Sequence, residues 1–200
     1  MSECTEERFL KDVAQHEMTV VRDDGVSRHL RFQKPGTYDM HFDLITWPGY
    51  LCYTGDMGTY VFKRLKDMFA FFRTEGLRIN PGYWGEKLQA VDSCDGYRQW
   101  SKHKFEQLIR DAFDEWVEDG ELSTAQKKAL QAQFESDVIR ASDYGKDTAY
   151  LAARDFEFAG QSPFQDWWEV DTDEYSFRFI WCCYALAWGV QQYDEARRIQ

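Results

Sequence analysis

The chain has 200 residues and a mass of 23.7 kDa, which is enough to bury a hydrophobic core without disulfides or a metal ion. Its 24 Lys and Arg residues stand against 35 Asp and Glu residues, and the formal charge of −11 argues against direct binding to nucleic acid or to anionic lipid. The hydrophobic share of 44% and the aromatic share of 17% exclude intrinsic disorder.

The first 75 residues predict a helix followed by an antiparallel meander. Thr5 is placed to cap the helix, and Asp23-Asp24-Gly25 is a strong hairpin signal. Alternating apolar and polar side chains between turn sequences predict strands over 18–22, 26–33, 38–47 and 50–54, and a short fifth strand or the approach to a helix over 59–62.

One face of this meander carries a candidate catalytic or ligand-binding group. If residues 34–38 form the hairpin loop, His29 lies opposite Asp43 and Arg31 opposite His41, on the face away from the core. A carboxylate beside an imidazole is the starting point of acid–base or metal chemistry. An ordinary solvated face with charged cross-strand pairs explains the same residues.

Helical periodicity takes over from about residue 61 and runs to Gly76, and a short helix is expected near 84–90. Ser101 is placed to cap the clearest helix in the chain, which Gly120 ends. Ser123 and Gln126 match a capping box that opens a helix to about residue 141. Two more helices are expected near 147–158 and 174–198.

These elements predict an α+β fold. Residues 1–75 are expected to form a first helix and an antiparallel meander of four to five strands. This part packs against an acidic helical region, residues 76–200, and the two form a single domain of residues 1–200. The longest apolar run, residues 179–190, is too short to span a bilayer and predicts a buried helix.

The sequence predicts neither a cofactor nor a metal. It contains no H-E-x-x-H, G-x-S-x-G or phosphate-binding loop, and its five cysteines form no C-x-x-C pair. Unpaired cysteines indicate a reducing cytoplasm. The acidic residues near the start of the chain predict no secretory signal.

Acidic residues are concentrated in the second half of the chain, where residues 101–200 carry 20 acids and 11 bases. Residues 106–121 hold seven of these acids against Arg110 alone. On a helix, Asp111, Asp114, Glu115 and Glu118 recur at rises of about 4.5–6 Å, near the separation of successive phosphates on a nucleic-acid strand. This face can occupy a basic groove meant for DNA or RNA, or it can simply keep the protein in solution.

A second acidic segment, residues 166–174, includes Asp171, Asp173 and Glu174 and contains no base. It lacks the glycine and the distal glutamate of an EF-hand calcium loop. Next to it, Trp167 and Trp168 cannot both enter one core. Either one ring is exposed at an interaction surface, or both cover the base of the last helix.

The stretch HFDLITWPGYLCYTGDMGTYVFKRLKDMFAFFR, residues 41–73, and the preceding MTVVRDDGVSRHLRF, residues 18–32, resemble a family of small proteins encoded by bacteriophages and prophages. The resemblance covers about the first 90 residues and carries no catalytic residues with it. It implies a phage accessory protein in the bacterial cytoplasm, where host takeover and inhibition of host defences are common roles.

Two classes of function follow. The first is a non-enzymatic interaction protein whose acidic residues bind a basic surface of a host or phage protein that handles nucleic acid, such as a CRISPR effector or a restriction enzyme. The second is a small enzyme, or a binder of a nucleotide-like ligand, that uses His29, His41 and Asp43. The sequence predicts no membrane contact and leaves the oligomeric state open.

Overall fold

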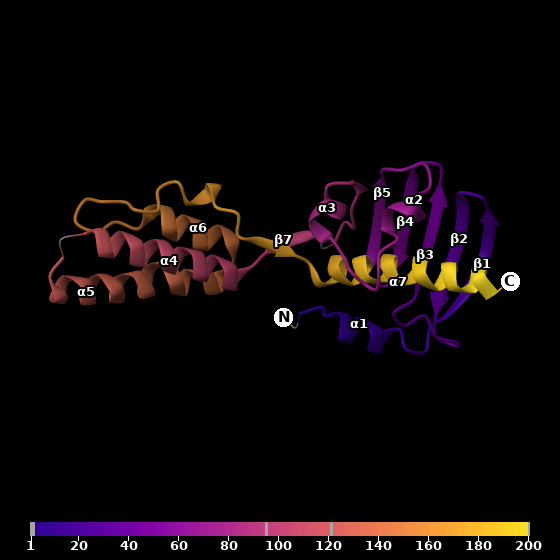
Figure 1. The fold of residues 1–200 in the computed structure, drawn as a ribbon. Coiled ribbons are helices and arrows are strands. Elements are labelled where there is room, and N and C mark those ends of the chain that lie inside the picture. Colours follow the sequence, from indigo (N-terminus) through magenta and orange to yellow (C-terminus); the bar gives the residue numbers. More distant parts are fainter. Residues whose placement is uncertain (1–2, 95, 121, 200) are drawn as a thin grey trace. The chain divides into compact units, whose positions relative to one another are not determined.

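The computed structural model describes residues 3–94, 96–120 and 122–199, and its chain divides into two compact units (Figure 1). Unit 1 comprises Met1–Arg98 and Tyr175–Gln200, and unit 2 comprises Gln99–Glu174. The chain passes between the units through β7 (Arg98–Trp100) and β8 (Asp173–Tyr175), which pair with each other. The predicted α+β class is confirmed.

Unit 1 is built on a six-stranded antiparallel sheet whose strands follow each other in chain order. Its strands are β1 (Glu17–Asp24), β2 (Ser27–Gln33), β3 (Phe42–Trp47), β4 (Tyr50–Gly55), β5 (Gly58–Lys63) and β6 (Leu88–Ala90). The meander predicted from the sequence is therefore confirmed. The sixth strand was not predicted.

The helices of unit 1 are α1 (Glu6–Asp12), α2 (Met68–Phe72), α3 (Pro81–Gly85) and α7 (Phe177–Ile199). The long helix α7 runs across the sheet in Figure 1 and places Trp181 against Phe42 and Trp188 against Phe32. Gly189 allows the close approach, because a Cβ there would lie 2.7 Å from Leu44 Cδ1. The core of unit 1 lies between this helix and one face of the sheet.

The predicted third strand begins four residues too early. Residues 38–41 form a turn in which Met40 has a φ of 55°, and β3 starts at Phe42. The register therefore differs from the prediction, since Arg31 pairs with Asp43 and His29 with Ile45. His41 lies outside the strand.

The helical prediction from residue 61 is also corrected. Residues 61 and 62 belong to β5, and only Met68–Phe72 is helical. The segment predicted as a helix near 84–90 contains the end of α3 and the strand β6. The apolar spacing in these short segments is equally compatible with a strand, which explains the errors.

Unit 2 is helical and has its own core, in which Phe113 stacks on Phe134 at 4.0 Å between ring centroids. Ser101 caps its first helix by accepting a hydrogen bond from the Lys104 amide, as predicted. The predicted capping box of Ser123 and Gln126 is present too. The helical segments are α4 (Lys102–Asp119), α5 (Thr124–Phe134), a π-helical turn (Glu135–Ile139), a 3₁₀ turn (Arg140–Tyr144), α6 (Lys146–Asp155) and a 3₁₀ turn (Trp167–Glu169).

Among the described residues, no helix combines the length and the apolar character needed to cross a membrane. The apolar run of residues 179–190 lies within α7, and ten residues of this helix are buried in unit 1. All five cysteines are free thiols, and Cys4, Cys182 and Cys183 are buried in the same core.

Candidate functional site

The four predicted stripe residues of α4 share one exposed face. Asp111, Asp114, Glu115 and Glu118 are all exposed. Phe105, Ile109 and Phe113 mark the buried side of the same helix, which faces the core of unit 2. With 3.6 residues per turn, the four carboxylates fall within about 100° of arc on the side opposite the buried residues. We call this group the α4 stripe.

Arg110, the one base in the sequence of residues 106–121, forms its hydrogen bonds outside the α4 stripe. Arg110 binds Glu135, at the start of the π-helical turn, with both terminal guanidinium nitrogens. Hydrogen bonds from Arg110 lower the pKa of the Glu135 carboxyl below its ordinary value, although partial burial opposes the change. The structure gives the four stripe carboxylates neither a hydrogen bond nor an ion pair with any described residue. Glu121, which belongs to the same acidic segment, lies outside the described residues.

The charge of the whole protein is carried by unit 2. Residues 99–174 contain 18 acids and 8 bases, a formal charge of −10, whereas the rest of the chain contains 17 acids and 16 bases, a formal charge of −1. A helical unit with this net charge attracts positively charged partners and repels nucleic acid.

The predicted residues around the tryptophan pair also lie in unit 2, but they differ in environment. Trp167 is buried in the unit 2 core, whereas the side chain of Trp168 is 60% exposed. Asp171 and Glu174 are exposed, and Asp173 is half-buried and binds Lys146 at 2.9 Å. The carboxylate of Asp171 accepts a hydrogen bond from the Asp173 amide.

A groove of about 430 Å³ lies beside Trp168. The start of α6 (Lys146, Asp147 and Tyr150) forms one wall, and residues 168–173 form the other. This groove was not predicted from the sequence. Its two walls are about 20 residues apart in the chain, so no local pattern brings them together.

The candidate face of His29, His41 and Asp43 does not form as one group. His29 Nε2 lies 2.7 Å from Asp43, and Arg31 donates two hydrogen bonds of 2.9 Å to the same carboxylate. His41 Nδ1 instead lies 3.2 Å from Asp56, in the turn between β4 and β5. Asp43 is only 7% exposed, and burial would raise its pKa, but the hydrogen bonds from Arg31 and His29 lower it below its ordinary value.

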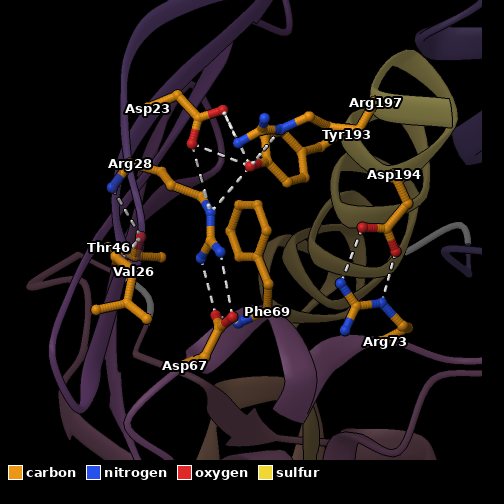
Figure 2. A network of polar contacts seen from close by, with 10 residues as sticks. All are labelled: Asp23, Val26, Arg28, Thr46, Asp67, Phe69, Arg73, Tyr193, Asp194 and Arg197. Carbon is orange, nitrogen blue, oxygen red and sulfur yellow. Dashed lines mark hydrogen bonds and ion pairs between the residues drawn. The ribbon is translucent and has the colours of Figure 1, made fainter. Parts of the chain in front are cut away.

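A further polar network in unit 1 was not predicted from the sequence (Figure 2). The guanidinium of Arg28 lies between the rings of Phe69 and Tyr193 and donates two hydrogen bonds, of 2.8 and 3.1 Å, to Asp67. Arg28 Nε donates a third hydrogen bond to the Tyr193 hydroxyl, which donates in turn to Asp23. The network ties the β1–β2 hairpin to α2 and α7, so its geometry indicates a structural role.

The part of the chain that the structure describes contains no group of three or more His, Cys, Asp or Glu residues arranged to hold a metal ion. Comparison with protein-family models, with curated proteins and with solved structures finds no match to this chain.

Proposed function

We propose that this chain is a phage accessory protein that acts by protein–protein interaction in the bacterial cytoplasm. Its acidic unit 2 binds a basic surface of a host or phage protein that handles nucleic acid, in place of that nucleic acid. An inhibitor of a host defence system, of the anti-CRISPR or anti-restriction type, fits this mode of action.

The observation that carries the proposal is the α4 stripe. Four exposed carboxylates occupy three successive turns, with Asp114 and Glu115 sharing the middle one, on a helix whose opposite side is fixed in the unit 2 core. A rigid row of negative charge complements a groove lined by Lys and Arg, and such complementarity raises the rate of association. The concentration of charge in unit 2 supports the same conclusion, because a solubilising surface does not require one unit to carry −10 and the other −1.

The alternative, a small enzyme or a binder of a nucleotide-like ligand, uses the face of His29, His41 and Asp43. The separation of His41 from the other two leaves this hypothesis with the pair of His29 and Asp43. Arg31 occupies both oxygens of the Asp43 carboxylate, which favours a structural role for that pair.

The test compares the wild type with a variant in which Asp111→Asn, Asp114→Asn, Glu115→Gln and Glu118→Gln are combined. The substitutions keep the size of the side chains and leave the buried side of α4 intact. We expect the tagged wild type to capture a nucleic-acid-binding protein from bacterial lysate and to release it between about 50 and about 500 mM salt, because salt screens exposed charges. Duplex DNA added to the purified complex is expected to displace the wild-type chain.

A matched control removes four exposed carboxylates of unit 1 instead, by Glu7→Gln, Glu17→Gln, Glu75→Gln and Glu86→Gln. Each variant loses four negative charges, so the two differ only in where those charges were removed. The control is expected to bind as the wild type does, and the α4 variant is expected to lose the partner. Equal binding by the α4 variant and the wild type would overturn the proposal.

A further inference from the structure

The groove beside Trp168 is preformed. Tyr150 bridges its two walls by donating a hydrogen bond to the Val170 carbonyl at 3.1 Å and by sharing another with the Thr172 hydroxyl at 2.6 Å. Thr172 is 1% exposed, and its carbonyl accepts a hydrogen bond from the Ser101 amide. Lys146 joins the walls a second time through its ion pair with Asp173. A ligand would therefore find the walls already in place, which lowers the entropic cost of binding.

The groove is negative. Four carboxylates (Asp147, Glu169, Asp171 and Asp173) and the single ammonium of Lys146 line it, so its formal charge is −3. Lys146 is held by Asp173, and that contact raises the pKa of Lys146. A positively charged ligand would therefore complement the groove.

Trp168 determines which kind of cation fits. Trp168 is 60% exposed and lines the groove together with the four carboxylates. An aromatic face beside carboxylates suits a planar guanidinium, which stacks on the ring and donates paired hydrogen bonds to an acid. An ammonium lacks the planar fork, and the described residues offer no arrangement of ligands for a metal ion.

We propose that this groove binds an arginine side chain from the surface of the partner protein. The volume of about 430 Å³ lies near the lower end of the range for ligand sites and suits a single amino-acid residue. This inference rests on the proposed function, because it assigns unit 2 a second contact with the same basic partner. Surfaces that bind nucleic acid are rich in arginine, so the α4 stripe and the groove would both bind basic side chains of the same partner.

The experiment titrates the full chain with the acetylated, amidated tripeptide Gly-Arg-Gly and follows nuclear magnetic resonance signals. The probes for comparison are the same tripeptide with lysine or with neutral citrulline in the central position. We expect the arginine peptide to shift the indole N–H signal of Trp168 and the amide signals of Val170 and Thr172 in a saturable way. The lysine peptide is expected to bind about tenfold more weakly, and the citrulline peptide not to bind.

Two variants locate the site. Trp168→Leu keeps an apolar side chain but removes the ring, and it is expected to weaken the effect of the arginine peptide on the Val170 and Thr172 amides by about tenfold. Tyr144→Leu removes another exposed aromatic ring of unit 2, one that does not line the groove, and is expected to change nothing.

The inference is overturned if the arginine peptide gives no saturable shift, if citrulline binds equally well, or if Trp168→Leu binds like the wild type. The titration needs no partner protein and leaves the α4 stripe untouched. Failure here with intact partner capture would therefore remove the groove and keep the proposed function. Saturable arginine binding without partner capture would overturn the proposed function and keep only an arginine-binding groove.

Discussion

The two units of this chain handle charge in opposite ways. Unit 1 is almost neutral, and several of its partly buried carboxylates are held by arginines, as in the pairs of Asp43 with Arg31 and of Asp67 with Arg28. Unit 2 carries a formal charge of −10, and four of its carboxylates stand exposed along α4. In unit 1 these charges hold parts of the fold together, whereas the α4 stripe of unit 2 stays exposed and makes no ion pair with a described residue.

The substitution with the largest expected effect on stability destabilises unit 2 alone. Phe134→Ala removes a fully buried ring that stacks on Phe113 and also touches Phe156 and Phe164, and the cavity is expected to cost about 3–5 kcal/mol. Because the two units have separate cores, hydrogen exchange is expected to accelerate in α4 and α5 and to stay slow in β3 and β4. Equal acceleration in both units would show that they unfold as one.

The next effect breaks the arginine network of unit 1. Asp67→Asn removes the nearer of the two carboxylates that pair with Arg28, at 2.8 Å against 3.9 Å for Asp23. It keeps the cap of α2, because the Asn side chain can still accept the hydrogen bond from the Phe69 amide. The side chain of Arg28 is only 10% exposed, so loss of this nearer charge is expected to lower the free energy of unfolding by about 1–3 kcal/mol. Denaturant titration measures the change. Arg154→Met, which breaks an exposed pair with Asp155 in unit 2, serves as the control and is expected to leave the melting temperature unchanged.

The same network predicts a dependence on pH. Burial would raise the pKa of Asp67, but the hydrogen bonds and charge of Arg28 lower it below the ordinary value of 3.8. A carboxyl with a lowered pKa in the folded state contributes stability above its ordinary pKa and loses it as the pH falls through the folded value. The difference in stability between wild type and Asp67→Asn is therefore expected to be full at neutral pH and to shrink below about pH 4. A difference that stays constant down to strongly acidic pH would contradict this explanation.

Features set by neighbouring residues could be predicted from the sequence, and features set by distant residues could not. The helix starts of unit 2 were predictable, because Ser101 and the pair of Ser123 and Gln126 act on amides within three residues. The start of β3 was not, because the turn before it is fixed by distant groups: His16 donates to the Met40 carbonyl, and Asp56 accepts from the Met40 amide. Two-residue periodicity continues through such a turn without a visible break.

The same distinction between local and distant contacts applies to the candidate sites. The exposed face of α4 was predictable from helical spacing alone, and the structure places all four predicted residues on it. The groove depends on Tyr150 reaching Thr172, and the arginine network on Arg28 reaching Asp67 and Tyr193. These contacts join residues 22, 39 and 165 positions apart, so they follow from the tertiary fold and leave no periodic signal in the sequence.

The smallest expected effect concerns the two histidines on unit 1. In His29→Ala, Asp43 keeps both hydrogen bonds from Arg31, and His41 contributes only partly exposed contacts, so each substitution is expected to cost at most about 1 kcal/mol. Arg31→Met is the matched control: it leaves the buried carboxylate with His29 as its remaining partner and is expected to cost more than either histidine substitution. Partner capture and displacement by DNA are expected to stay at the wild-type level in both histidine variants, because the contacts assigned to the partner lie in unit 2. If His29→Ala abolished the biological activity at an unchanged melting temperature, the charge of unit 1 would have a chemical role. The enzyme hypothesis would then replace the conclusion that the charged residues of unit 1 only stabilise its fold.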